Sequence, residues 1–415
     1  MSRRVVITGI GIIAPNGIGK DAVWTSVNES RVALSGITRF DTEGFSSDVA
    51  GELRGFDPLD FMNVRLSRKL DPFTQYAIAA SQLALKDAEL DLARVDKLAF
   101  GVYVGNCFGG WAFTDRELRK LHNQGPRELS AFQATAWFPA APQGQISILL
   151  ELRGHSKTIV CDRASGLASI GYAARNIAQG KSDLILAGGT EAPITPLIFS
   201  ACSTDGVLAK RRRGAGESYL PFDEKHEGLV LGEGSAFLLL EEREHALRRN
   251  AKIYAELHGF AMTSDACHPA PLPAEERGLS VAMREALRDA AVAPEAVSFV
   301  MADGMATKEG DYQEAQAIHK VFGERAASVP VTAPKSMFGH LYGAAGAVDV
   351  ALSALSLQHR VIPPTASLTT LASDCRLDVV TTPRKAEAMD YVLIAGRGSG
   401  GTNAAVVIAA PEQAC

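Results

Sequence analysis

The chain has 415 residues, a formal net charge of −5 at pH 7 and 21% charged residues, a balance that argues against nucleic acid as a partner. No apolar run reaches the ~20 residues of a membrane span, so we expect a soluble protein without a membrane partner. Six cysteines without paired spacing indicate reduced thiols in a cytoplasmic protein, not a disulfide framework or a metal site, and we expect no signal peptide before the first strand.

The first predicted strand begins at Val5 and contains Gly9-Ile10-Gly11, a pair of glycines that could open a dinucleotide-binding loop. That motif needs a third glycine, which is absent, and Pro15 interrupts the turn that would follow. We therefore predict a structural strand and no nicotinamide site.

A helix is predicted over residues 109–121, where Trp111, Thr114 and Leu118 fall at positions i, i+3 and i+7 and hence on one face. Such a face either packs against the protein core or lines a cavity. The spacing alone leaves both interpretations open.

The segment 157–179 has the shape of a nucleophile elbow. An apolar strand runs to Cys161, a turn of small residues follows, and a helix with apolar periodicity continues over 167–179. The N-terminus of such a helix favours an anion and would lower the pKa of a thiol, yet the residue at the turn is Arg163. Cys161 lies inside the strand, so we interpret it as a packing residue.

The one basic run is Lys210-Arg-Arg-Arg213. We interpret it as a solvated loop, with a docking patch for an acidic carrier protein as the alternative.

The fold class follows from strands of unbroken apolar character that alternate with amphipathic helices, a pattern typical of α/β layers around buried sheets. A strand and small turn over 184–190 is repeated over 391–402, and 415 residues are many for one core. We therefore predict two halves of a pseudo-duplicated fold, residues 1–255 and 256–415. The helices predicted besides the two above cover residues 73–88, 281–291 and 344–357.

Five further motifs resemble the β-ketoacyl synthase family and occur in that family's order. The resemblance spans nearly the whole chain and implies a thiolase fold, with two pseudo-repeated halves in an α-β-α-β-α layered sandwich, and carbon–carbon bond formation on carrier-protein thioesters. The motifs lie at residues 5–11, 221–234, 335–346, 362–365 and 400–403.

Condensing members of this family use a cysteine and two histidines. Motif by motif, the cysteine position falls on Arg163 and the first histidine position on Asp303, whereas the second histidine is present as His340, five residues after Lys335. The phenylalanine of the family's C-terminal gate is replaced by Ser399. The resemblance therefore implies a vestigial site with no intact catalytic set.

Two expectations concern the side chains that remain there. We interpret His340 and Lys335 as retained architecture, a satisfied polar residue and an internal ion-pair partner, although in condensing relatives such residues polarise the thioester and assist decarboxylation. A buried arginine needs a partner, so we predict a charge-assisted pair between Arg163 and Asp303. The alternative is that Arg163 turns to Asp162 or to a backbone carbonyl.

The pattern of losses resembles one subfamily, the chain length factors, or ketosynthase β subunits, of bacterial type II polyketide synthases. This resemblance implies that the helix over 109–121 lines a growing-chain tunnel with Trp111, Thr114 and Leu118, and that the dimer interface includes Phe132, Gln133 and Trp137. Most chain length factors have glutamine where this chain has arginine, a departure that weakens any glutamine-dependent decarboxylation.

The resemblance implies a heterodimer with a catalytic ketosynthase α subunit, which would condense malonyl units on an acyl carrier protein. The carrier would bring the phosphopantetheine arm, and this chain would need no cofactor of its own. Two alternatives remain open: an independent homodimeric malonyl decarboxylase that uses His340 and Lys335, and a purely structural dimer partner without influence on the product.

Overall fold

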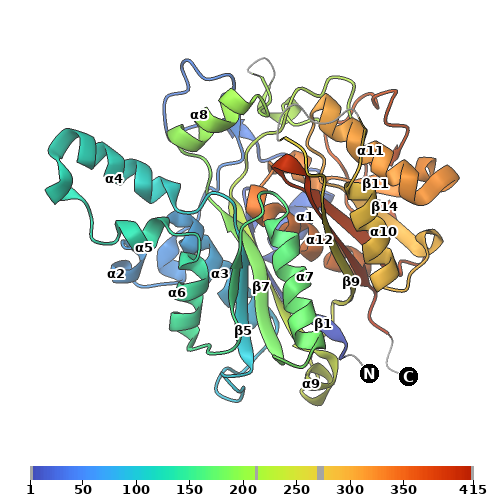
Figure 1. Ribbon diagram of the computed structural model, residues 1–415, viewed down its shortest axis with the longest axis horizontal. Helices are drawn as coiled ribbons and strands as arrows, with labels where there is room; N and C mark the ends of the chain where they lie inside the picture. Colours follow the sequence, from blue (N-terminus) through green and yellow to red (C-terminus); the bar gives the residue numbers. More distant parts are fainter. Residues whose placement is uncertain (1–2, 211–213, 269–274, 413–415) are drawn as a thin grey trace.

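The computed structural model describes residues 3–210, 214–268 and 275–412 and is built around one large mixed sheet (Figure 1). Its strands pair in the order β13-β11-β10-β15-β16-β9-β1-β8-β7-β5-β6, with β2 paired to β1. The strands of this sheet are β1 (Val5–Ala14), β2 (Gly17–Ile18), β5 (Phe100–Gly105), β6 (Lys157–Ile159), β7 (Leu184–Glu191), β8 (Gly234–Glu242), β9 (Ala255–Ser264), β10 (Val297–Met301), β11 (Pro330–Thr332), β13 (Asp378–Val379), β15 (Tyr391–Arg397) and β16 (Thr402–Ala409).

The two halves of the sheet have the same topology. The order β6-β5-β7-β8-β1 in the first half corresponds to β11-β10-β15-β16-β9 in the second, with the same order of strands along the chain. The halves join where β1 and β9 pair antiparallel, with Val5 opposite Leu257. The predicted pseudo-repeat is therefore confirmed. The domain boundary at residue 255 stays a prediction, and β9 begins at Ala255.

The helices complete five layers. Helices α7 and α12 lie between the two halves of the sheet and contact strands of both, whereas α3 covers β1 and β8 on one outer face and α10 covers β9 and β16 on the other. The helices are α1 (Lys20–Asn28), α2 (Val64–Ser67), α3 (Pro72–Asp87), α4 (Trp111–Gln124), α5 (Gln133–Trp137), α6 (Ala141–Leu150), α7 (Ser165–Ala178), α8 (Pro196–Asp205), α9 (Arg243–Arg248), α10 (Leu279–Asp289), α11 (Lys308–Phe322) and α12 (Ala345–His359).

The predicted thiolase fold and its α-β-α-β-α layers are thus observed. Two small sheets, β3 (Ser35–Gly36) with β4 (Val49–Ala50) and β12 (Val361–Ile362) with β14 (Arg384–Lys385), lie outside the main sheet. Among the described residues, no helix is long and apolar enough to cross a membrane.

Close packing between the two central helices fixes the start of α7. A Cβ atom at Gly166 would lie 2.8 Å from the backbone nitrogen of Ala347 in α12, and one at Gly346 would lie 2.5 Å from Leu167. Real side chains do not approach that closely, so glycine at both positions allows α7 to begin directly against α12. This contact places Arg163, two residues before the helix, in the interior of the molecule.

Helices α4 and α5 form an arm that extends to one side of the layered body, next to α6 (Figure 1). The predicted helix over 109–121 begins two residues later, at Trp111, and ends at Gln124. Its N-terminal end contacts α8, and its polar side is otherwise exposed, with only Phe113, Thr114 and Glu117 buried. The arm therefore carries most of its surface outside the core.

Candidate functional site

The elbow predicted between β6 and α7 is present. Asp162 adopts a left-handed backbone conformation with φ 55°, which turns the chain sharply before the helix. The hydroxyl of Ser165 locks this turn, since it donates to the carbonyl oxygen of Asp162 at 2.6 Å and accepts from the N–H of Cys161 at 2.9 Å. The side chain of Arg163 consequently projects from the turn into the protein.

Arg163 is 4% exposed, and its guanidinium is held on several sides. Nε donates to the carbonyl oxygen of Arg397 at 2.9 Å, and Nη1 lies 3.3 Å from both the Ser399 hydroxyl and Asp162 Oδ2. Nη2 lies 3.5 Å from the sulfur of Met305. Burial opposes the charge, but Asp162 outweighs it and raises the pKa of Arg163, so the guanidinium stays protonated. A hydrogen-bonded cation therefore fills the nucleophile position.

The predicted pair between Arg163 and Asp303 is wrong. Within the described parts of the chain, neither a hydrogen bond nor an ion pair joins the two residues; Asp303 Oδ1 instead accepts from His340 Nε2 at 3.3 Å. The alternative is correct on both counts, because Arg163 pairs with Asp162 and with a backbone carbonyl. The physical reason is proximity: Asp162 is the adjacent residue, and its turned backbone brings the carboxylate to the guanidinium.

His340 is a neutral, fully occupied imidazole. Its Nδ1 accepts from the N–H of Tyr342 at 3.0 Å, which puts the ring proton on Nε2, where it is donated to Asp303. Burial lowers the pKa of His340. Burial also acts to raise the pKa of Asp303, but the hydrogen bond from His340 and the charges of Arg163 and Lys335 outweigh it, so the pKa of Asp303 lies below its ordinary value. Asp303 thus accepts the Nε2–H of His340, which is the donor that a substrate oxygen would need.

Lys335 forms an internal ion pair. Its ammonium donates to the carbonyl oxygen of Ala302 at 2.6 Å and lies 2.9 Å from Asp349 Oδ2 in α12. Burial raises the pKa of Asp349 to about 6, although Lys335 acts in the opposite direction. Nearby, Glu314 accepts from the backbone N–H groups of Asp303 and Gly304, and burial followed by the charge of Asp303 raises its pKa to about 8.

Sequence reasoning did not identify Asp162, Asp349 or Glu314 as parts of this site. A signal existed for Asp349, which is the one acidic residue in an otherwise apolar helix and would need a buried cation. Asp162 was considered only as an alternative partner. Glu314 sits on the polar α11 and gave no distinct signal.

The gate position belongs to the same network. The N–H of Ser399 donates to Asp162 Oδ2, and a Cβ at Gly398 would lie 3.0 Å from the Cβ of Asp162, so the gate segment rests directly on the elbow. Burial acts to raise the pKa of Asp162, but Arg163 and the Ser399 N–H lower it below its ordinary value. The carboxylate therefore stays ionised and links the gate segment to Arg163.

Two thiols lie near the elbow and neither is activated. Burial raises the pKa of Cys161, and burial together with Asp162 raises the pKa of Cys107. Among the described residues, no group of three or more His, Cys, Asp or Glu side chains could hold a metal ion. The arrangement offers no nucleophile at the turn.

The three predicted tunnel residues have different surroundings. Trp111 packs against a buried apolar cluster that includes Phe199 and Tyr342, next to the Arg163 site. Thr114 is buried, and its hydroxyl accepts from the amide of Gln133 at 2.9 Å. Leu118 is 44% exposed. They share a helix face, on which Thr114 is buried, Trp111 is partly buried and Leu118 is exposed.

Of the predicted interface residues, Phe132 is 40% exposed and Trp137 is 41% exposed, whereas Gln133 is half-buried and bound to Thr114. They belong to a larger set of exposed apolar side chains on and around α4, α5 and α6, which we call the apolar arm patch. It comprises Leu118, Leu121, Phe132, Trp137, Phe138, Ile148 and Leu149. Large exposed patches of this kind mark interaction surfaces. In the basic run, Lys210 is exposed, and residues 211–213 lie outside the described residues.

Comparisons with known proteins agree with this geometry. Residues 2–246 match the model "Beta-ketoacyl synthase, N-terminal domain" and residues 254–369 match "Beta-ketoacyl synthase, C-terminal domain". The chain is 37% identical to the 3-oxoacyl-[acyl-carrier-protein] synthase 2 of Coxiella burnetii, over 98% of both chains. It is 39% identical to the tetracenomycin polyketide synthase ketoacyl synthase beta subunit of Streptomyces glaucescens, over 97% of this chain and 98% of that one.

Among solved structures, the ishigamide ketosynthase/chain length factor superposes with a TM-score of 0.92 and 32% sequence identity, over 99% of this chain and 100% of that chain. The relatives therefore include a synthase named for its condensing reaction as well as a beta subunit.

Proposed function

The chain belongs to the β-ketoacyl synthase family, and we propose that it is a non-condensing member of it: the chain length factor of a type II polyketide ketosynthase heterodimer. The observation that carries this proposal is the state of the nucleophile position. Arg163 is buried there with its guanidinium bound to Asp162, Ser399 and the Arg397 carbonyl. A residue so placed can neither attack a thioester nor leave space for one.

The similarity to a condensing synthase does not oppose this proposal, because the chain departs from the condensing pattern at the reacting positions. The family's cysteine position is Arg163, and its first histidine position is Asp303, an anion that binds the remaining His340. Claisen condensation needs a nucleophile and donors that stabilise the developing oxyanion. The nucleophile is absent at the elbow. The side-chain donors of His340 and Lys335 are already hydrogen-bonded within the chain.

A catalytic ketosynthase subunit is the proposed partner. The apolar arm patch supports an extensive contact, since apolar side chains of this size are stable on a surface mainly when a partner covers them. Strand β6 offers a second place for contact with the partner, because it ends the sheet and leaves the edge of its backbone unpaired within the described chain. A solved relative is titled as a ketosynthase together with a chain length factor.

Length control would be steric. Trp111 is the large side chain on α4 that packs toward the interior, so we place it at the end wall of a tunnel that begins in the partner. Thr114 and Leu118 would line the same face of α4 where it meets the partner. Adding two carbons to a full tunnel would cost ~1–3 kcal/mol of strain, enough to slow the next condensation against release.

The acyl carrier protein would bring malonyl and growing-chain thioesters on its phosphopantetheine arm to the partner subunit, in the cytoplasm. This chain would bind no cofactor of its own. The Lys210–Arg213 run remains a proposed contact for the acidic carrier.

The alternative of an independent malonyl decarboxylase is not favoured by the site. Decarboxylation needs N–H donors aimed at the thioester oxygen. The Nε2 proton of His340 is donated to Asp303, and Lys335 is held by Asp349 and the Ala302 carbonyl. A purely structural partner role would differ in one respect, because substitutions of Trp111 would then leave product length unchanged.

The test is reconstitution. The chain, the ketosynthase encoded beside it and the acyl carrier protein are purified separately and combined with malonyl donors, and the thioester products are measured by mass spectrometry. We expect product only when both subunits are present. Condensed product from this chain alone, or full activity of the ketosynthase without it, would overturn the proposal.

A further inference from the structure

A small pocket beside the sheet edge is lined by basic side chains, of which Arg175 alone has an acidic partner within the described chain. Its volume is about 260 Å³, and it is bounded by β5, the chain around β6, and α7 with the residues that follow it. Four basic side chains line it together with Tyr103, Tyr172, Asn176 and Gln179, and no carboxylate does. The four, which we call the cationic pocket, are His155, Lys157, Arg175 and Lys181.

The charges of the two lysines in this pocket have no partner within the described chain. The ammonium groups of Lys157 and Lys181 form no hydrogen bond or ion pair with any residue that the structure describes. His155 is held in place by the Tyr103 hydroxyl, which lies 2.8 Å from its Nδ1. Because these side chains are exposed, water and salt screen their mutual repulsion, and the two lysines are free to pair with an anion of another molecule.

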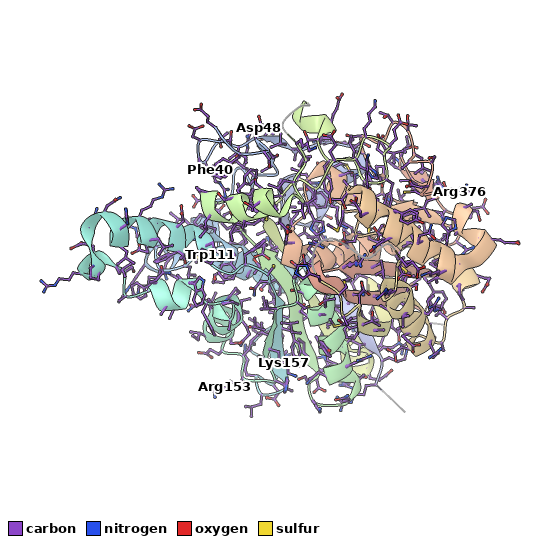
Figure 2. All side chains as sticks on the ribbon, turned by 45° about the horizontal axis from the view of Figure 1, so that its top comes forward. Phe40, Asp48, Trp111, Arg153, Lys157 and Arg376 are labelled. Carbon is purple, nitrogen blue, oxygen red and sulfur yellow. The ribbon has the colours of Figure 1, made fainter. Side chains whose placement is uncertain are left out.

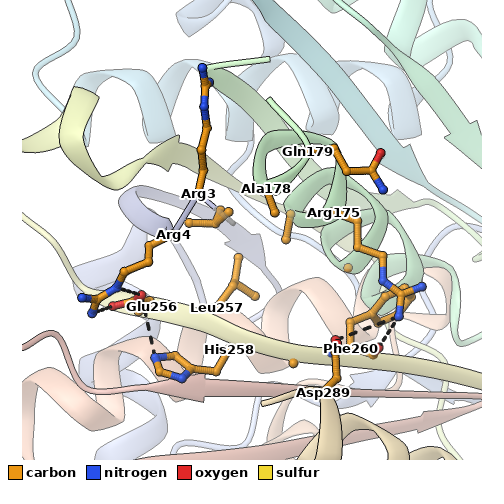
Figure 3. A pocket seen from close by; sticks show the side chains of 14 residues that line it. Arg3, Arg4, Arg175, Ala178, Gln179, Glu256, Leu257, His258, Phe260 and Asp289 are labelled. Atoms are coloured by element: carbon orange, nitrogen blue, oxygen red, sulfur yellow. Dashed lines mark hydrogen bonds and ion pairs between the residues drawn. The ribbon is translucent and has the colours of Figure 1, made fainter. Parts of the chain in front are cut away.

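An adjacent pocket along α7, which shares Arg175 and Gln179 with the first, shows a different arrangement (Figure 3). It is larger, about 650 Å³, and it also contains arginines, but each has an acidic partner on this chain. Arg4 binds Glu256, and Arg175 lies 4.0 Å from Asp289. Arg175 lines both pockets, so the difference lies in Lys157 and Lys181, for which the described chain supplies no carboxylate. These two lysines remain available to an external anion.

The position of the pocket identifies the kind of anion. Lys157 is the first residue of β6, the strand that ends the sheet, and Figure 2 places Lys157 and the exposed Arg153 at the same end of the molecule. Two exposed apolar side chains adjoin it: Val160, just after β6, is 55% exposed, and Tyr172 in the pocket lining is 41% exposed. Basic and apolar groups together beside a free strand edge are typical of a protein interface more than of a small-molecule site.

We propose that acidic side chains of the catalytic ketosynthase subunit enter the cationic pocket, and that its charge selects this partner over a second copy of the chain. The inference rests on the proposed heterodimer. In a two-fold homodimer that pairs through β6, each copy would bring the same basic pocket to the symmetry axis. Lys157 and its neighbours would then face the same basic residues of the second copy. Complementary charge would favour the ketosynthase, and like charge would disfavour self-association.

The test is charge reversal at the two free lysines. The variant Lys157→Glu/Lys181→Glu is compared with Lys308→Glu/Lys385→Glu, two exposed lysines of the other half, which changes the net charge equally. The dissociation constant with the purified catalytic ketosynthase subunit is measured at low and high salt. We expect the first variant to bind at least tenfold more weakly at low salt and to lose most of the salt dependence. The control should stay within about twofold of the wild type.

A second readout follows the self-association of the same variants by sedimentation velocity. The introduced carboxylates would face His155 and Arg175 of a second copy, so the pocket variant should gain homodimer where the wild type and the control do not. Equal ketosynthase affinity of the two variants, with no gain of homodimer, would overturn the inference and leave the proposed function intact. Failure of the wild type to bind the ketosynthase at any salt concentration would overturn both.

Discussion

The Arg163 site combines residues of both halves of the chain, whereas the apolar arm patch belongs to the first half, and the two regions differ in how completely their side chains are satisfied. At the Arg163 site, charged groups are buried and bound to one another: Arg163 to Asp162, His340 to Asp303, and Lys335 to Asp349. On the arm, Phe132 and Trp137 and their neighbours are large, apolar and about half exposed.

The difference between these bound charges and the exposed apolar side chains bears on what each region can do. At the Arg163 site the N–H groups of Arg163, His340 and Lys335 are bound within the chain, whereas Asp303 Oδ2 and Asp349 Oδ1 have no hydrogen-bond partner among the described residues. The site therefore has few donors left for a thioester oxygen. A surface that leaves apolar side chains in water has capacity for a partner. Under the proposed function, the first region has lost its chemistry and the second keeps the contact with the partner.

The largest expected effect concerns chemistry at the closed site. Arg163→Cys should not create a condensing enzyme, because Asp303 stands where an imidazole base would be and also holds His340. The rate of acyl transfer to the new thiol should stay at least ~10²-fold below that of the partner ketosynthase, the lower bound for a missing general base. Single-turnover acylation followed by intact-mass analysis measures it. A rate comparable to the partner's would show that the site was only blocked by Arg163.

The next effect concerns the stability of the closed site. Arg163→Met leaves the largely buried Asp162 without its cation and should lower the free energy of unfolding by about 2–4 kcal/mol at pH 7, measured by urea denaturation. The variant Asp162→Asn/Arg163→Met should recover most of this loss, because asparagine tolerates the left-handed backbone and keeps an acceptor for the Ser399 N–H. In contrast, a double-mutant cycle between Arg163 and Asp303 should give a smaller coupling energy than one between Arg163 and Asp162, because only the charges of the first pair interact and no hydrogen bond joins them. A larger coupling with Asp303 than with Asp162 would reverse the assignment of partners.

The same ion pair predicts a dependence on pH. The pKa of Asp162 is depressed in the folded chain, so its stabilising contribution is present above its ordinary value of 3.8 and is lost as the pH falls through the lower, folded value. The stability difference between wild type and Arg163→Met should therefore shrink when unfolding is repeated below pH 3.8. A difference that stays constant with pH would indicate that Arg163 stabilises the protein by packing alone.

A smaller effect is expected on the arm. Trp137→Ala should weaken the heterodimer by ~1–3 kcal/mol, about tenfold or more in the dissociation constant, because aromatic anchors dominate such interfaces. Tyr391→Phe, a partly buried residue at the start of β15 in the other half, serves as a control and should leave the affinity unchanged. Isothermal titration with the ketosynthase measures both. Unchanged affinity of the Trp137 variant would remove the arm from the proposed interface.

The smallest expected effect is a change in the length of the product, which is also the most specific measurement of the tunnel. Trp111→Ala should leave a cavity of roughly 100 Å³ and allow some product one or two acetate units longer, at a lower total yield. Leu118→Phe should shift the distribution toward shorter chains. Mass spectrometry of the thioester products measures both. If both variants give product of the parent length at a reduced rate, α4 has a packing role and does not set the length of the product.

The fold could be predicted because its signals are local or repeated. The apolar periodicity of residues 73–88 and 344–357 corresponds to α3 and α12 within two residues at each end, and the strand-turn repeat gave the two halves. The elbow was predicted from the small residues before α7, which pack against α12.

The partners of Arg163 could not be predicted in the same way. Family positions place Arg163 and Asp303 across one pocket, but which carboxylate the guanidinium reaches depends on the left-handed backbone of Asp162, and a positive φ at a non-glycine residue has no sequence signal here. The cationic pocket was missed for a related reason. Lys157 and Lys181 come from opposite ends of the segment around α7, and only the register of β6 against that helix brings them together.

The central claim is that the partner carries the chemistry and this chain does not. It is tested most directly by asking which subunit becomes acylated when the purified heterodimer is incubated with an acyl-loaded carrier protein, by intact-protein mass spectrometry of both chains. We predict the acyl mass increment on the ketosynthase alone, with this chain unmodified over the same time. An acyl adduct on this chain at a comparable level would contradict its assignment as the non-condensing subunit.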